Sequence, residues 1–268
     1  MSDKKNKRTA VSKPFLKGSP TDENTFRQIL KFIGMLILSS FMAFLVCMMT
    51  SFNSDILRIA VNVAIEGMVL LIFFSRGSEH GTEAVARGEI LYQHIQKGQE
   101  VSEGEKRIPF NRMKGFVTGI CGTLVFLIPT VIIALTAQKQ MTGSGTLPSW
   151  MEGYLKRPEI GGALTQYTQA GSISFADIVR VFVRIMIMPF VRMAGAEDRN
   201  LLLAIERISP ILVLFPAAAY GTGYLQGPSR RARIHSEISE NKRRKISRER
   251  RERKARTAAK PKEPEQLN

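Results

Sequence analysis

The sequence is poor in the residues that form covalent or metal cross-links, with 2 cysteines and 3 histidines among 268 residues. Two cysteines cannot build a disulfide framework. Cys47 lies late in one apolar run and Cys121 early in another, so two runs that cross a bilayer in the same direction would keep the thiols too far apart to bond. His80 and His94 lie near glutamates, but no His-x₃-His spacing and no cysteine pair accompanies them. We therefore expect a solvated polar helix around these histidines, with no metal and no disulfide.

The short motifs of the common enzyme classes are also missing. The sequence has no phosphate-binding glycine loop after a strand, no nucleophile elbow and no metalloprotease helix. Its apolar runs contain no pair of acids and no histidine placed to abstract a proton. We expect a protein that is not an enzyme and that carries no cofactor.

The chain does contain long apolar runs. A bilayer core about 30 Å thick is crossed by roughly 20 helical residues, and four runs reach that length, at about 29–50, 55–75, 115–137 and 208–226. Several spans in 268 residues leave no room for a soluble domain of ordinary size. The predicted fold class is all-α, a polytopic integral membrane helical bundle with four transmembrane helices plus one amphipathic or re-entrant segment.

One apolar run carries a polar face. In 55–74, Arg58, Asn62 and Glu66 are four residues apart, which places them on one side of a helix. Glu66 would lie about 15 Å into the helix, where an ionised carboxylate costs at least ~2.5–3.5 kcal/mol unless it is paired or protonated. Arg58 is two turns away and close to the helix end, so its head is expected to reach water. We expect this intramembrane polar stripe to face other helices or a polar cavity.

The segment 173–194 is long enough to cross a membrane, yet it carries Arg180, Arg184 and Arg192 at separations that are multiples of four. Three interpretations stay open: a helix lying in the membrane interface, a re-entrant segment, or a fifth span. If the segment enters the bundle, the three arginines are candidate counter-charges for Glu66. Flanks rich in Lys and Arg stay in the cytoplasm, so both basic tails are expected there. This orientation requires an even number of spans and favours four.

Small residues mark the faces on which helices are expected to pack. Gly115, Gly119 and Thr123 repeat every four residues in the third run, and Gly221 lies among small residues in the last run. Such spacing lets two helix backbones approach closely, so we predict helix packing at these positions. At the outer edge of the last run, Glu206 is expected to pair with the arginine next to it or with lipid headgroups.

The positive charge is concentrated in two tails. The formal net charge is +16, and of 39 Lys and Arg, 15 follow residue 227 and eight precede residue 32. A nucleic-acid-binding domain would instead carry such charge on a folded surface. Residues expected to contact an anionic surface lie in the second tail: Arg230, Arg231, Arg233, Lys242, Arg243, Arg244 and Lys245.

The expected organisation follows from these runs and tails. A disordered basic tail at 1–28 precedes a transmembrane domain at 29–227. Its loop at 76–114 lies on the cytoplasmic side and its loop at 138–204 on the other side. The second basic tail, 228–268, is expected to be helical and then disordered.

These features favour a noncatalytic subunit or scaffold of a membrane complex, because kinked spans with long basic ends give little sign of a substrate path. The alternative is a small transporter or channel component in which Glu66 binds an ion or a proton, although the inverted repeat of many carriers is missing. Expected partners are the lipid bilayer, anionic lipid headgroups at the C-terminal tail, and a membrane protein or a second copy of this chain. Nucleic acid or the ribosome is a weaker candidate, because no stacking aromatics accompany the charge. The expected location is the plasma membrane.

Overall fold

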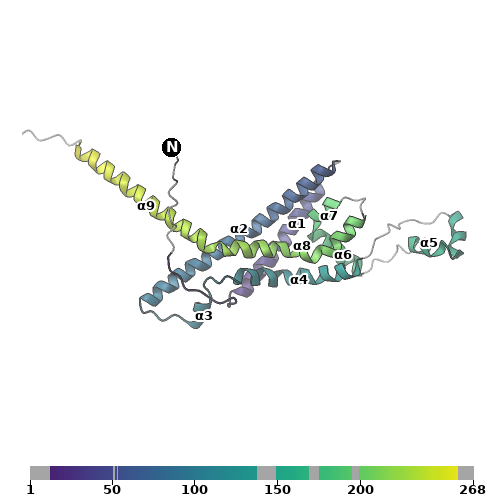
Figure 1. Ribbon diagram of the computed structural model, residues 1–268, viewed down its shortest axis with the longest axis horizontal. Helices are drawn as coiled ribbons and strands as arrows, with labels where there is room; N and C mark the ends of the chain where they lie inside the picture. The colour runs from purple at the N-terminus through teal and green to yellow at the C-terminus, as the bar shows by residue number, and fades with distance from the viewer. Residues whose placement is uncertain are drawn as a thin grey trace, which may run out of the picture.

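The computed structural model describes residues 13–50, 52, 54–137, 149–168, 175–194 and 199–258. Every regular element in these ranges is a helix (Figure 1). Four helices are long and apolar enough to cross a membrane, namely α1, α2, α4 and α8, so the predicted all-α bundle with four spans is confirmed. The elements are α1 (Thr25–Met49), α2 (Asp55–Gln96), α3 (Glu103–Arg107), α4 (Lys114–Thr136), the 3₁₀ helix η1 (Ser149–Lys156), α5 (Gly161–Thr168), α6 (Phe175–Met186), α7 (Met188–Ala194), α8 (Arg199–Leu225) and α9 (Gly227–Ala258).

The longest helix, α2, has 42 residues. At 1.5 Å per residue it is about 63 Å long, twice the thickness of a bilayer core. Its first half is apolar up to Phe74, and its second half, from Ser75 on, is mostly polar. The loop expected at 76–114 therefore begins as a direct continuation of the second span.

The bundle has two distinct ends. At one end, which we call the tail end, α1 and α4 begin and α8 finishes, because Lys114 contacts Asp22 and Gly115 lies against Tyr224. The second half of α2 projects from this end. At the other end, the loop end, α1 finishes and α2 begins, and Cys47 contacts Asn62 there.

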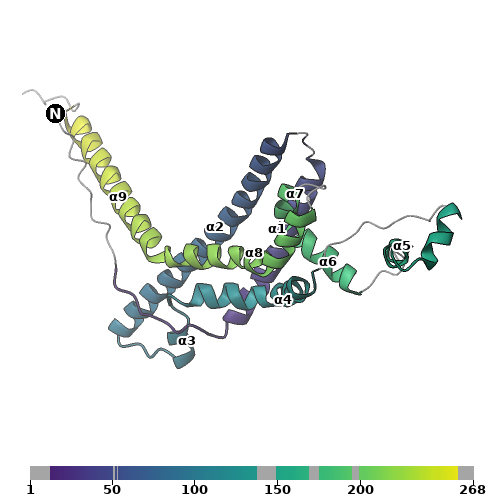
Figure 2. The same ribbon diagram turned by 45° about the vertical axis from the view of Figure 1, so that its right-hand side comes forward.

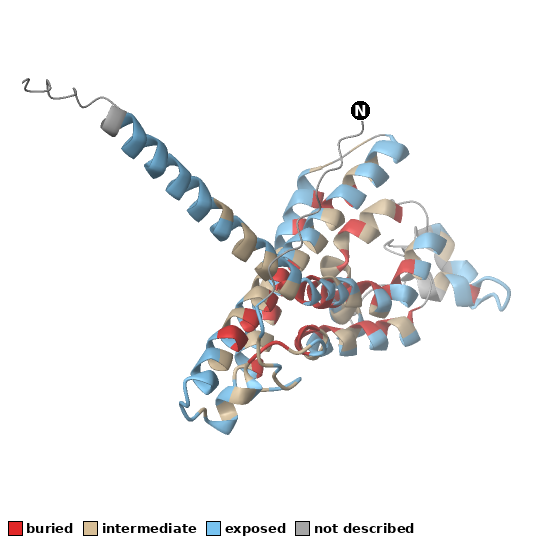
Figure 3. Cartoon of the chain, turned by 60° about the vertical axis from the view of Figure 1, so that its left-hand side comes forward, coloured by how far each residue is buried: buried red, intermediate tan, exposed pale blue. Residues whose placement is uncertain are grey.

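The core of the bundle forms where α8 packs against α2 and α4. Buried aromatic side chains from α1, α2 and α8 meet there: the Phe32 ring lies 5.2 Å from that of Phe73 and 5.3 Å from that of Tyr220, centroid to centroid. The outer faces of the spans carry exposed apolar side chains, and Figure 3 shows in pale blue how much of the helix surface is exposed. A broad exposed apolar surface around long helices is what a lipid environment requires.

The segment expected at 173–194 is two short helices and not one straight span. α6 finishes at Met186 and α7 begins at Met188, with Pro189 in its first turn, where a proline is tolerated. Val183 and Ile187 are buried in the main core, while Phe175 and Ile178 stay exposed. The pair therefore packs into the loop end of the bundle with one apolar face left outward.

The N-terminal tail differs from the disordered segment expected at 1–28. Residues 13–24 lie along the tail end and donate backbone hydrogen bonds, from Leu16 N–H to the Gly88 carbonyl and from Gly18 N–H to the Phe110 carbonyl, both 3.1 Å. The Phe15 ring meets the Phe110 ring edge-on. These partners are remote in sequence, so composition alone does not reveal the order. Residues 1–12 lie outside the described part of the chain.

The C-terminal helix α9 follows α8 almost without interruption. A single turn residue, Gln226, separates the two helices, and α9 leaves the bundle as a long arm (Figure 2). The helical part of the second tail extends to Ala258, and residues 259–268 lie outside the described residues.

Candidate functional site

The intramembrane polar stripe lies on one face of the first half of α2, and its members have different partners. Arg58 Nη2 lies 2.9 Å from Asp55 Oδ1. The buried Asn62 donates from Nδ2 to the Arg58 carbonyl at 2.8 Å and accepts from Cys47 Sγ at 3.3 Å. Asn62 thus ties the start of α2 to the end of α1.

Glu66 is the unpartnered member of the stripe. Its side chain is partly buried, and within the described part of the chain it has no ion pair and no hydrogen bond. The sequence suggested that Glu66 pairs with an arginine of 173–194; among the described residues, Arg180, Arg184 and Arg192 instead contact other groups. An ionised carboxylate in a membrane span is costly unless it is paired or protonated.

The buried acid that collects arginines is Glu206 on α8, which is only 2% exposed. Arg184 of α6 reaches Glu206 Oε1 with Nη2 at 2.6 Å and Nε at 2.8 Å, and Arg180 Nε lies 3.4 Å from the same oxygen. The expected pairing of Glu206 with its sequence neighbour or with headgroups gives way to this inward contact. Removal of one partner from a buried ion pair is costly, so Glu206 holds α6 on α8.

Arg192 has a third role. Its Nη2 donates to the carbonyl of Cys47 at 3.0 Å and to that of Thr50 at 3.4 Å. The last carbonyls of a helix have no intrahelical donor, and a cation at a helix C-terminus is favourable. Arg192 therefore caps α1 and fixes α7 at the loop end.

A buried ion pair lies at the tail end, where the sequence predicted a disordered tail at 1–28 and a loop at 76–114. Lys114 is 1% exposed, and its Nζ lies 2.5 Å from Asp22 Oδ2 and 2.9 Å from the Ile108 carbonyl. Asp22 also accepts from Thr25 Oγ1 at 2.6 Å. This pair joins the N-terminal tail to the start of α4. The pairing has no local spacing, so the sequence carries no signal for it.

A second buried cluster fixes the base of α9 on the projecting half of α2. Arg231 donates from Nη2 and Nε to Glu89 Oε2 at 2.9 and 3.0 Å, and His235 Nε2 lies 2.8 Å from Glu89 Oε1. Burial raises the pKa of Glu89. The hydrogen bonds and positive charge of Arg231 and His235 lower the pKa by more than burial raises it, so the pKa of Glu89 lies below its ordinary value. Arg231 and His235 are four apart, a spacing that could have indicated a shared acid.

The seven basic residues expected on an anionic surface fall into two groups. Arg231 is engaged by Glu89, and Arg230 Nη1 donates to Ser78 Oγ at 3.2 Å. The other five are exposed on α9, namely Arg233, Lys242, Arg243, Arg244 and Lys245. Arg244 pairs with Glu240 at 2.9 Å on the helix surface.

The small residues predicted for packing lie at helix contacts of α8. A Cβ on Gly115 would lie 2.5 Å from Tyr224 Cβ, and one on Gly119 would lie 3.0 Å from the Ala217 carbonyl oxygen. Gly221 lies under Phe116 in the same way, and Thr123 is fully buried.

A second pair of glycines, missed in the sequence, packs α2 on α8. Cβ atoms on Gly77 and Gly81 would overlap the carbonyl oxygens of Tyr220 and Tyr224. The Gly-x₃-Gly spacing was the available signal. It lies in a polar stretch, where a membrane packing motif is not expected.

Within the described residues, no three His, Cys, Asp or Glu side chains gather in a way that could hold a metal ion. The arrangement can instead hold helices in register and keep charged groups buried in pairs. No family model, no curated protein and no solved structure matches this chain.

Proposed function

We propose that the protein is a noncatalytic subunit or scaffold of a membrane complex, and that it presents α9 to an acidic surface of a partner protein. The observation that carries this proposal is a long basic helix whose base is fixed by buried contacts and whose residues 241–255 are all exposed. The proposal has both tails in the cytoplasm, which basic flanks favour, and the bundle in the plasma membrane.

The base of α9 is held by more contacts than a tail needs if its positive charge serves only to orient the protein in the membrane. Gly227 lies against Gly81 of α2, and over the next two turns Arg231 and His235 bind Glu89. The helix therefore leaves the bundle in a direction set by α2. A fixed direction allows the helix to contact a partner protein at a defined position.

The outer part of α9 offers charge and almost no apolar face. Every residue from 241 to 255 is exposed, and Ile246 is the one apolar aliphatic side chain larger than alanine in that stretch. A helix that is polar all round is stabilised by its own pairs, as in Arg244 with Glu240, or by bridging to another body. Nine of these fifteen residues are Lys or Arg and two are Glu, so an acidic partner surface is complementary.

Photo-crosslinking from α9 in native membranes tests the proposal. A photoreactive amino acid replaces Ile238 or Ile246, both exposed on α9, and Ile95 of α2 serves as an exposed control outside the arm. We expect a discrete protein adduct from α9 that disappears when Lys242, Arg243 and Lys245 are changed to Gln. An adduct with lipid alone would show that α9 binds the membrane surface, and an adduct with RNA would show that it binds nucleic acid. Either would contradict the scaffold proposal.

The alternative function, a small transporter or channel component, is supported by one observation. Glu66 lies in a membrane span without an ion pair among the described residues, as a group that binds a proton or a cation would. Glu66→Gln keeps the shape and removes the charge, and Glu83→Gln removes an exposed acid from the projecting half of the same helix. Ion flux in proteoliposomes that is lost in the first variant and kept in the second would favour transport. Equal behaviour of both variants would leave Glu66 as a packing residue.

A further inference from the structure

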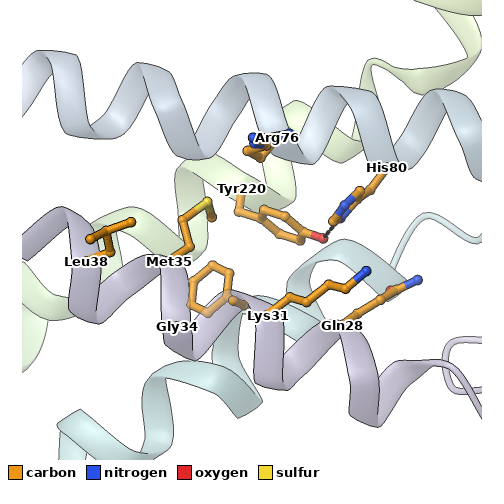
Figure 4. Close-up of a pocket in the computed structure, with 9 residues that line it drawn as sticks. Gln28, Lys31, Gly34, Met35, Leu38, Arg76, His80 and Tyr220 are labelled. Atoms are coloured by element: carbon orange, nitrogen blue, oxygen red, sulfur yellow. Dashed lines mark hydrogen bonds between the residues drawn. The ribbon is translucent and has the colours of Figure 1, made fainter.

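A cavity of about 420 Å³ opens at the tail end between α1, α2 and α8. Figure 4 shows its two halves: Lys31, His80 and the Tyr220 hydroxyl gather at one side, and Met35 and Leu38 lie at the other. The cavity is thus polar toward the tails and apolar toward the middle of the bundle. This order matches that of a phospholipid in a leaflet, with a polar headgroup at the surface and hydrocarbon chains below it.

The polar half has two donors, Lys31 and the His80 ring, that the described residues leave wholly or partly unused. Within the described part of the chain, Lys31 has no ion pair or hydrogen bond and is exposed. His80 Nδ1 lies 2.7 Å from the Tyr220 hydroxyl, so Nε2 is the ring nitrogen without that partner. Arg76 also lines the cavity, but it is already engaged through Nη1, which lies 3.0 Å from Glu79 Oε2.

Acidic side chains close to this half do not line the cavity. Glu79 is paired with Arg76, and Glu83 is exposed on α2. The charged side chains that line the cavity are Lys31 and Arg76. The nearby acids reduce the net charge of the region, so an anion has to be held by direct hydrogen bonds, which a phosphate group can accept from several donors at once.

The apolar half is open to the lipid side of α1. Leu38 is 62% exposed, and a Cβ on Gly34 would meet no heavy atom within 4 Å. The missing side chain at Gly34 leaves a groove that runs from Lys31 along α1. A lysine at such a level extends its ammonium toward the headgroups while its stem stays on apolar surface.

We propose that this cavity binds one glycerophospholipid of the adjacent leaflet, with its phosphate held by Lys31, Arg76 and His80 and an acyl chain lying over Gly34 beside Leu38. Phosphate recognition is the specific part of the contact, so phosphatidylglycerol and phosphatidylethanolamine both bind. Diacylglycerol, which has the same chains and no phosphate, does not bind. Inorganic phosphate, which has no chain, does not compete.

Native mass spectrometry of the delipidated full chain, titrated with phosphatidylglycerol, tests the site. The double variant Lys31→Gln, Arg76→Gln is compared with Arg27→Gln, Arg87→Gln, which removes the same charge from exposed positions of the same helices outside the cavity. We expect the first lipid to bind roughly tenfold or more weaker in the cavity variant and unchanged in the control variant.

A second pair of variants works through shape and leaves the charges intact. Gly34→Leu fills the groove, and Gly67→Leu adds the same side chain at another helical glycine with nothing within 4 Å. We expect Gly34→Leu to lose the lipid and Gly67→Leu to keep it, with thermal unfolding measured on every variant so that a misfolded protein is recognised. Equal binding in cavity and control variants, binding of diacylglycerol, or competition by inorganic phosphate would each overturn the proposal.

Discussion

Lys114 carries a buried positive charge, and among the described residues Asp22 is the acid that pairs with it. It is 1% exposed and contacts Asp22 at 2.5 Å. Loss of one partner of a buried ion pair leaves the other charge uncompensated, which costs about 3–5 kcal/mol, while replacement of both by apolar residues is often neutral. The pair is therefore a point at which single and double substitutions should behave very differently.

Lys114→Met should lower the free energy of unfolding by about 3–5 kcal/mol, and the double variant Lys114→Met, Asp22→Leu should recover most of that loss. Lys106→Met is the matched control, because its pair with Glu103 is exposed and such pairs contribute about 0–1 kcal/mol. Unfolding of the purified protein by SDS in mixed micelles measures all three. If Lys114→Met were as stable as Lys106→Met, the expected contribution of the buried ion pair would be contradicted.

Glu89 makes the attachment of α9 to α2 depend on pH. Its pKa is lower in the folded protein than its ordinary value of 4.5, so its contribution to stability is present above about pH 4.5. That contribution is lost as the pH falls through the lower folded pKa. Spin labels on α2 and the outer part of α9 should report a broader distance distribution at acid pH. In Glu89→Gln the distribution should already be broad at pH 7, and a distribution that stays narrow there would show that other contacts fix α9.

At the scale of whole elements, the contact between α2 and α8 depends on backbone closeness. A Cβ on Gly77 would overlap the Tyr220 carbonyl oxygen, which cannot move without moving α8. Gly77→Ala should therefore destabilise the bundle by about 1–3 kcal/mol. Gly67→Ala, in open space on the same helix, should be neutral or stabilising, because alanine is the better helix former. Thermal unfolding of the two variants measures the difference, and equal melting temperatures would contradict the close crossing.

The elements also show which features the sequence could reveal. The four spans follow from hydropathy alone, because a bilayer demands about 20 apolar residues whatever their neighbours are. The partners of the charged residues do not follow, since Arg184 meets Glu206 and Lys114 meets Asp22 across different elements. The order of residues 13–24 was hidden for the same reason: their hydrogen bonds end on α2 and on the loop before α4.

At the scale of the whole molecule, two buried contacts place both tails at one end of the bundle. The N-terminal tail is joined to the start of α4 through Asp22, and α9 is joined to the projecting half of α2 through Glu89. Four crossings would put residues 13–24 and α9 on the same side of the membrane. The basic flanks favour the cytoplasm for that side, while η1 and α5 lie beyond the loop end.

Labelling of single cysteines with a membrane-impermeant maleimide tests this orientation in intact cells. The background replaces both natural cysteines by Ser. Lys17→Cys and Lys245→Cys should label after lysis only, because both positions lie on the tail side, whereas Gly153→Cys in η1 should label before lysis. Labelling of Lys245→Cys in intact cells with Lys17→Cys still protected would require an odd number of crossings, and α6 with α7 would then have to supply the fifth. Labelling of both tails from outside would keep four spans and reverse the bundle, and it would remove the cytoplasmic partner from the proposed function.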